Sequence, residues 1–211
     1  MFSLSTLLSD PLIFMVGFLA LAVSIGVHEF AHVLSAYLQG DTTGKAMGRL
    51  TLNPIKHLDP WGTIAIVVAG IGWGRPAPYN PNNLRFRRWG PLLVAIAGPI
   101  SNIIITAIAG YTLVIFDGTL PTGNLLLTFL QTLVILNAAL AVFNLLPIAP
   151  LDGSHILSAV LGQEHPIVRM LRQYGVFILL GLMLVGGGIL GAYIMGGVTI
   201  LLKLIGLGAF V

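Results

Sequence analysis

The chain is a series of long uncharged stretches separated by short polar segments. Pro11 to Val27 contains no charged residue, and the apolar character resumes after a short polar cluster and continues to about Leu38. A transmembrane helix needs about 20 apolar residues, so this run predicts a first span from Pro11 to about Leu38. Two further runs, Gly90 to about Phe116 and Leu125 to Leu146, predict a second and a third span.

The remaining apolar runs are shorter or rich in glycine. Residues 61–73 are too few to cross a bilayer unaided, which favours a re-entrant or broken segment. Residues 174–211 are long enough for two tilted or short helices, broken around Gly186 to Gly188. We therefore expect an all-α polytopic membrane protein with about four to six transmembrane or re-entrant segments. We expect it to form a single membrane-embedded domain over residues 1–211.

Polar segments separate these runs at residues 40–60, 74–89 and 162–173. In the first of them, Leu50 and Leu52 alternate with Arg49 and Thr51, a pattern that permits a short strand or hairpin. Seven of the ten basic residues lie between Lys45 and Arg88. The positive-inside rule assigns that side of the protein to the cytoplasm. The first span then ends, and the third span returns, at the cytoplasmic side.

Composition narrows the class of protein. Hydrophobic residues make up 56% of the chain and charged residues only 8%, whereas a soluble domain carries about a quarter charged residues. We therefore predict a multi-pass protein of the cell membrane whose environment is the lipid bilayer. The net charge of +3 arises from few charges, so we expect no nucleic-acid partner. Cysteine is absent, which excludes thiolate ligands and disulfides.

The first predicted span contains the sequence His28-Glu29-Phe30-Ala31-His32. Two histidines four residues apart lie on one face of a helix, so both imidazoles can reach one metal ion. Glu29 lies near the same face, where it can accept a proton from a water that the metal activates. Ionisable groups at membrane depth are costly and mark functional sites. The pattern therefore predicts an intramembrane metal centre.

Zinc suits this ligand set and requires a third protein ligand. Four residues are candidates, namely Asp152, His155, Asp59 and His57. Asp152 leads because it lies in a turn flanked by proline and glycine just after the third span. It is equally compatible with a helix N-cap for the short apolar segment that follows. His57 is placed in a polar loop, where a turn or packing role is expected.

The two separated motifs together resemble the site-2 protease family of intramembrane zinc metalloproteases, in its small prokaryotic type without PDZ or nucleotide-binding extensions. The resemblance rests on His28 to His32 and on the downstream stretch Asn144 to Gly153. It extends, in the expected order over roughly residues 20–160, to Gly48-Arg49-Leu50-Thr51-Leu52-Asn53-Pro54, His57-Leu58-Asp59-Pro60-Trp61-Gly62, Gly74-Arg75-Pro76-Ala77-Pro78-Tyr79-Asn80-Pro81 and Ala97-Gly98-Pro99.

The resemblance implies a zinc-dependent endopeptidase that hydrolyses peptide bonds in or near transmembrane segments, with one Zn²⁺ per chain. It implies that His28, His32 and Asp152 hold the metal and that Glu29 is the general base. It also implies that Asn144 positions substrate or stabilises the oxyanion, although a buried Asn can instead join helices by hydrogen bonds.

Three expectations complete the prediction. The substrate is expected to be a transmembrane protein with a single span, and the active site is expected near the cytoplasmic side. His155 stands where such proteins are expected to have arginine or another non-ligand. It can share a helical face with Asp152, but three ligands already complete the site, so we interpret it as an interfacial residue. The alternative function is a membrane metal-ion transporter or sensor that uses the same His and Asp ligands.

Overall fold

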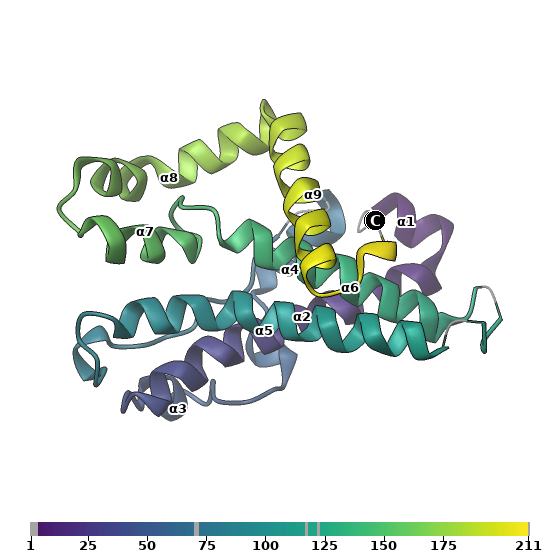
Figure 1. The fold of residues 1–211 in the computed structure, drawn as a ribbon, viewed down its shortest axis with the longest axis horizontal. Coiled ribbons are helices and arrows are strands. Elements are labelled where there is room, and N and C mark those ends of the chain that lie inside the picture. The colour runs from purple at the N-terminus through teal and green to yellow at the C-terminus, as the bar shows by residue number, and fades with distance from the viewer. Residues whose placement is uncertain (1–3, 70–71, 117, 122, 211) are drawn as a thin grey trace.

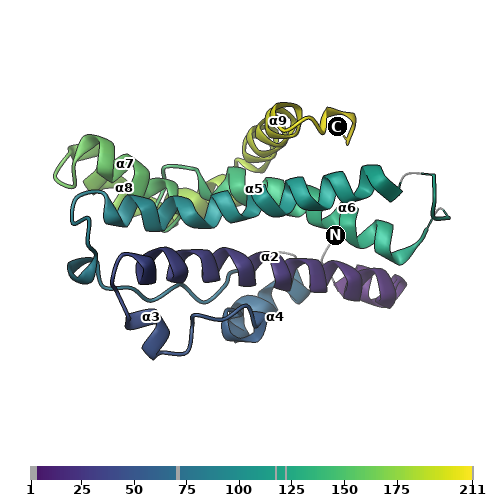
Figure 2. The ribbon, with the colours of Figure 1, turned by 60° about the horizontal axis from the view of Figure 1, so that its bottom comes forward.

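Three long helices form the centre of the molecule. The computed structural model describes residues 4–69, 72–116, 118–121 and 123–210. Helices α2 (Pro11–Leu38), α5 (Gly90–Phe116) and α6 (Leu125–Asn144) lie side by side along the long axis (Figures 1 and 2). The structure confirms the predicted bounds of the first two spans. The third span ends at Asn144, two residues earlier than predicted, because the residue before Pro147 is disfavoured in a helix.

Local signals explain where α2 begins. Asp10 accepts a hydrogen bond from the backbone N–H of Ile13 at 3.0 Å, and Pro11 occupies the first helical position. This is the usual combination of a capping carboxylate and a proline that has no N–H to leave unpaired. Because α2 begins at Pro11, its histidine motif lies in the C-terminal half of the helix, beside α5.

The C-terminal part of the chain extends away from these helices. It consists of α7 (Gly153–Leu161), α8 (Pro166–Leu184), α9 (Gly187–Leu204) and the short helix η3 (Gly208–Phe210). Helix α9 returns to pack on α6, where Val198 and Leu202 enter the main apolar core with Val134 and Ala138. The predicted pair of helices broken at the glycines is confirmed.

One boundary differs from the prediction. Helix α8 begins at Pro166, within the stretch 162–173 that the sequence assigned to a polar segment. The side chain of His165 accepts a hydrogen bond from the N–H of Ile167, and Arg169 pairs with Glu164 at 2.8 Å. The polar residues therefore belong partly to an exposed first turn of a helix.

Short elements connect the long helices. They are α1 (Leu4–Ser9), α3 (Thr43–Ala46), η1 (Pro54–Lys56), α4 (Pro60–Ala69) and η2 (Pro81–Asn83). Helix α4 has ten residues, about half of what a span requires. Among the described residues, five helices are long and apolar enough to cross a membrane, namely α2, α5, α6, α8 and α9.

The strand permitted at Leu50 to Leu52 is not formed. Residues 50 and 51 are bends, and the nearby β contact is an isolated antiparallel bridge between Leu58 and Gly74. The Thr51 carbonyl accepts a hydrogen bond from the His57 side chain and not from a neighbouring strand.

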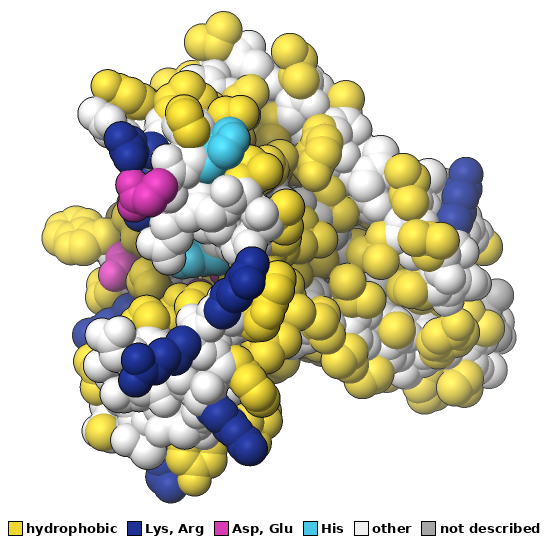
Figure 3. Space-filling model, turned by 60° about the vertical axis from the view of Figure 1, so that its left-hand side comes forward, with side chains coloured by type: hydrophobic (Ala, Val, Ile, Leu, Met, Phe, Trp, Pro, Cys, Tyr) yellow, Lys and Arg dark blue, Asp and Glu magenta, His cyan; other side chains and the backbone are white. Residues whose placement is uncertain are grey.

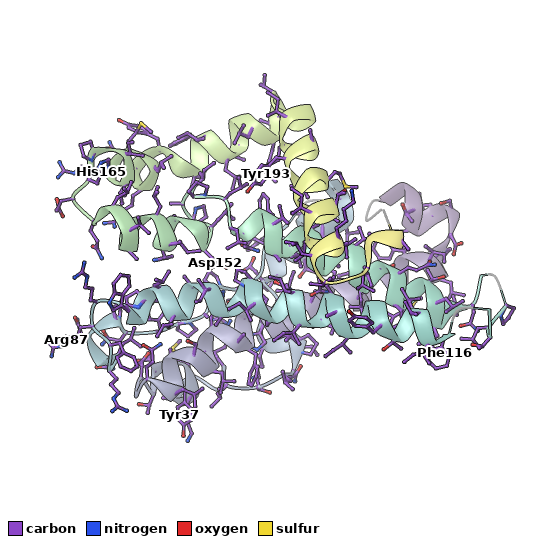
Figure 4. All side chains as sticks on the ribbon, in the orientation of Figure 1. Tyr37, Arg87, Phe116, Asp152, His165 and Tyr193 are labelled. Carbon is purple, nitrogen blue, oxygen red and sulfur yellow. The ribbon has the colours of Figure 1, made fainter. Side chains whose placement is uncertain are left out.

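The polar segments gather at one end of the molecule. Figure 4 places Tyr37, Arg87 and His165 at that end and Phe116 at the opposite one. Figure 3 shows Lys and Arg side chains crowded toward one end of the face that it draws, with histidine side chains between them. The C-terminal end of α2, the start of α5 and the end of α6 therefore point to the same end.

Candidate metal centre

His28 and His32 come together with Asp152 from distant parts of the chain. The two histidines lie on the face of α2 that packs against α5, and their Nε2 atoms are 3.0 Å apart. Asp152 lies just before α7, between α7 and α5 in Figure 4. Its Oδ2 is 3.2 Å from His28 Nε2, and its Oδ1 is 3.4 Å from His32 Nε2. The three side chains form one group of potential metal ligands.

The other nitrogen of each imidazole is occupied by an oxygen acceptor. His28 Nδ1 lies 2.6 Å from Asn102 Oδ1, and His32 Nδ1 lies 2.7 Å from the Val94 carbonyl. Since these partners accept, each Nδ1 carries the proton and each Nε2 presents a lone pair. Two lone pairs and a carboxylate then face one another in a buried space, an arrangement that a metal cation at its centre would satisfy.

The spacing of the donor atoms fits zinc. Zinc bonds to histidine nitrogen and carboxylate oxygen are about 2.0–2.2 Å long in a tetrahedral site, so its ligand atoms lie roughly 3.3 Å apart. The three separations between donor atoms, 3.0, 3.2 and 3.4 Å, bracket that value. Three protein ligands leave a fourth position open, as catalytic zinc sites do.

Asp152 does not act as the N-cap that its position also permitted. It precedes α7, but its side chain makes no capping hydrogen bond. Burial raises the pKa of its carboxyl group, yet hydrogen bonds from His28 and His32 in their protonated forms, together with the charge of those rings, outweigh that effect and lower the pKa to about 2. The group is therefore an anion at neutral pH and is turned toward the two imidazoles.

Glu29 opens onto a cavity of about 320 Å³ that His28, His32 and Asp152 also line. Its Oε2 atom is buried and has no hydrogen-bond partner in the structure. A carboxylate oxygen in that condition requires a proton, a water or a ligand close to it. The cavity thus brings a potential base beside the three converging donors.

The remaining predicted residues divide into two groups. Asn144 and His155 line the same cavity, and the Asn144 amide donates to the Leu140 carbonyl within its own helix at 3.0 Å. Asp59 caps α4 by accepting from the Gly62 N–H, and His57 donates to a backbone carbonyl. The last two are therefore structural residues of the loop and were candidates only by residue type.

The sequence interpretation missed polar residues behind the histidines. Asn102, Asn137 and Ser24 are completely buried, and Asn102 contacts His28 directly. Gly98 is also part of the site, because a Cβ there would lie 2.5 Å from His32 Nε2 and 2.6 Å from His28 Cε1. The available signal was the presence of uncharged polar residues inside apolar spans.

Comparisons with known proteins agree with this geometry. The chain matches the description "Peptidase family M50" over residues 16–125 and 112–186. It is 47% identical over 146 residues to "Putative zinc metalloprotease YwhC" of Bacillus subtilis (strain 168), covering 66% of each chain. It is 30% identical over 169 residues to "Putative zinc metalloprotease Rip2" of Mycolicibacterium smegmatis, covering 77% of this chain and 64% of the relative.

A more distant relative is "Zinc metalloprotease MJ0392" of Methanocaldococcus jannaschii, which is 26% identical over 164 residues. The match covers 78% of this chain and 40% of that protein, so this chain spans only part of the length of its relatives. No solved structure matches the chain. Since one family description accounts for residues 16–186 of a multi-pass membrane protein, the chain belongs to peptidase family M50, the site-2 proteases that its motifs resemble.

Proposed function

We propose that this protein is a zinc-dependent intramembrane endopeptidase that cleaves peptide bonds in or near transmembrane segments of membrane proteins. The observation that carries the proposal is the meeting of two imidazole lone pairs and the Asp152 carboxylate beside the free oxygen of Glu29. This donor set lies among helices that are long and apolar enough to cross a membrane.

His28, His32 and Asp152 are the residues that would hold zinc. Zinc, when bound, supplies a Lewis acid that polarises the scissile carbonyl and increases the acidity of water. Glu29 accepts the proton from the attacking water and passes it to the leaving amine. The cavity position of Asn144 supports a role in binding the developing oxyanion, an interaction that typically contributes about 3 kcal/mol.

A membrane-embedded substrate must expose its carbonyl groups before it can react. In a helix those carbonyls are hydrogen-bonded to the backbone, so the substrate has to unwind at the cleavage site. Part of the cavity wall is an irregular segment that contributes Trp73, Gly74 and Tyr79. The open space beside this segment supports binding of an unwound peptide, and a single-span protein can supply one without dismantling a helix bundle.

The distribution of charge supports a location near the cytoplasmic side of the cell membrane. The basic segments between Lys45 and Arg88 follow the end of α2 that carries the histidines. By the positive-inside rule this end faces the cytoplasm. Water then reaches the site over a short distance.

The transporter or sensor alternative receives no support from the comparisons, because the relatives named above are metalloproteases. A transporter or sensor function also gives Glu29 no chemical role. A transporter requires polar groups that continue across the membrane. In the described residues of the five candidate spans, Glu29 is the only carboxylate.

The experiment is cleavage of a purified single-span substrate by the purified full chain, with and without a zinc chelator. We expect cleavage that the chelator abolishes and that zinc restores. Glu29→Gln is expected to keep bound zinc and lose cleavage. The matched control is Glu164→Gln, since Glu164 is exposed and pairs only with Arg169. Cleavage by Glu29→Gln at the parental rate would remove Glu29 from the role of base.

A further inference from the structure

Arg49 is a buried cation that the proposed chemistry does not use. Its residue is 4% exposed, and no carboxylate of the described residues forms an ion pair with it. Its Nη2 atom donates to the Arg75 carbonyl at 2.6 Å and lies 3.5 Å from His57 Nδ1, while its Nε atom is buried without a partner. Burying a charge in this way is costly, so the position requires an explanation.

His57 completes the surroundings of the guanidinium. It is fully buried, and its Nε2 donates to the Thr51 carbonyl at 2.7 Å. That bond leaves Nδ1 as an acceptor facing Arg49. Burial lowers the pKa of His57, the bond to Thr51 raises it, and the charge of Arg49 lowers it, with a net value below the usual one. The ring is therefore neutral and accepts from the guanidinium at neutral pH.

Arg49 and His57 together hold both backbone groups of Arg75. The Arg75 carbonyl accepts from Arg49, and the Arg75 N–H donates to the His57 carbonyl at 2.7 Å. The adjacent bridge between Leu58 and Gly74 extends the same attachment by one residue. These contacts use only the backbone of Arg75, so its side chain is dispensable for them.

The backbone held in this way faces the proposed base. A Cβ on Gly74 would lie 2.7 Å from Ile25 Cγ2 and 3.8 Å from Glu29 Oε1. Trp73, Gly74 and Pro76 line the cavity that contains Glu29. The charge of Arg49 also acts across this wall, because burial lowers the pKa of its guanidinium while the Glu29 carboxylate opposes that effect.

We propose that Arg49 is a positioning residue for the reaction: through His57 and the Arg75 backbone it fixes residues 73–76 as the cavity wall beside Glu29. The proposal rests on the proposed function for its effect on cleavage. Its effect on the wall is independent of that function. A wall displaced by about 1 Å can reduce turnover by as much as a hundred-fold, because the substrate carbonyl is no longer presented correctly.

The test uses the full chain, zinc-loaded, in detergent or in lipid vesicles. Arg49→Met removes the donor fork, and Arg49→Lys retains a charge that can reach one carbonyl at most. The matched control is Arg87→Met, which removes an exposed arginine at the same end of the molecule but outside the cavity lining. Three quantities are measured: bound zinc, kcat and KM on a single-span substrate, and amide hydrogen exchange at residues 73–75.

We expect Arg49→Met to keep the parental zinc content, to lower kcat at least about ten-fold and to accelerate exchange at residues 73–75. Arg49→Lys is expected to fall between it and the parent, and Arg87→Met to stay within about two-fold of the parent by all three measures. Exchange at residues 73–75 that is unchanged in Arg49→Met, or a fall in kcat that is fully explained by lost zinc, would overturn the proposal.

The proposal can still be tested if Arg49→Met does not fold or if the parent protein does not cleave the substrate. If Arg49→Met does not fold, the same comparison is made between Arg49→Lys and Arg87→Met, and equal exchange in the two would overturn the proposal. If the parent binds zinc but cleaves nothing, the proposed function fails. The exchange measurement then still decides whether Arg49 holds the wall.

Discussion

The Nδ1 atom of His28 lies 2.6 Å from the Oδ1 atom of Asn102, and this contact begins a chain of hydrogen bonds across three spans. Asn102 Nδ2 donates to Asn137 Oδ1 at 2.8 Å, and Asn137 Nδ2 donates to Ser24 Oγ at 2.8 Å. All three side chains are fully buried. Because the membrane interior offers no water to satisfy an amide, this series of hydrogen bonds holds Asn102 with its oxygen toward His28.

Asn137→Leu is expected to weaken zinc binding although Asn137 touches no ligand. The substitution leaves the Asn102 amide nitrogen without its partner, so Asn102 can rotate and present its nitrogen to His28. Outer hydrogen-bond partners of metal-binding histidines typically contribute 10- to 100-fold in affinity. We expect about a ten-fold loss for Asn137→Leu and a larger one for Asn102→Leu, measured by competition with a chromophoric chelator.

Thr112→Val is the control for both variants. Thr112 lies on the same helix as Asn102, is exposed, and bonds only to the Ile108 carbonyl of its own turn. Its replacement is expected to leave zinc affinity unchanged. Parental affinity in Asn102→Leu would show that the tautomer of His28 does not depend on this chain.

Gly98→Ala is expected to disrupt the metal centre directly. The added Cβ would lie 2.5 Å from His32 Nε2 and 2.6 Å from His28 Cε1, closer than unbonded heavy atoms approach. The imidazoles or the α5 backbone must move, so we expect at least a ten-fold loss of zinc affinity by analogy with outer-partner mutations. Gly191→Ala is the control, because a Cβ there meets no atom within 4 Å. Equal zinc affinity in the two variants would contradict the close packing of α5.

Much of this arrangement follows from one-dimensional patterns. The length of the apolar runs predicts the approximate bounds of α2 and α5, since a bilayer fixes how many apolar residues a helix requires. Charge counting alone predicts that His28 and Asp152 reach the same side of the membrane. The contact between their side chains confirms that prediction.

The remainder depends on contacts that no local pattern encodes. Asn137 and Ser24 are 113 residues apart in sequence, and each is an ordinary polar residue within its own span. Sequence spacing also could not decide whether Asp152 is a helix N-cap or a metal ligand. The direction of its side chain separates them, and that direction is set by the packing of α7 against α5.

Asp152→Ala is expected to lower bound zinc sharply, whereas His155→Ala is expected to retain it. Both residues line the cavity, but only the Asp152 carboxylate lies within 3.4 Å of the histidine Nε2 atoms. Loss of the anionic ligand leaves two imidazoles, which is fewer than a zinc site requires. Elemental analysis of the purified chains measures the difference. Full occupancy in Asp152→Ala, with loss in His155→Ala, would transfer the third-ligand role to His155.

Asp41 provides a test of pH-dependent stability away from the metal. Its carboxylate accepts from the N–H and hydroxyl of Thr43, from the Asn80 N–H at 2.8 Å and from the Asn83 amide at 3.0 Å. It thereby ties the chain after α2 to η2. Burial raises the pKa of Asp41, but these hydrogen bonds outweigh it and hold the pKa below 3.8.

A pKa that is lower in the folded state gives stability that is fully present above the unfolded value, about 3.8, and that is lost as the pH falls through the folded value. Asp41→Asn removes this contribution, so we expect it to be less stable than the parent by on the order of 2 kcal/mol at pH 7. The difference should shrink as the pH falls below about 3.8 and through the lower folded pKa of Asp41, because the parental carboxyl group then also becomes neutral. The stability difference is measured by thermal unfolding of the detergent-solubilised chain, followed by tryptophan fluorescence at pH 7 and at a pH below the folded pKa of Asp41. Asp10→Asn is the control, since asparagine caps a helix as well as aspartate does. A difference between Asp41→Asn and the parent that persists unchanged at low pH would mean that the carboxylate charge is not what holds the two segments together.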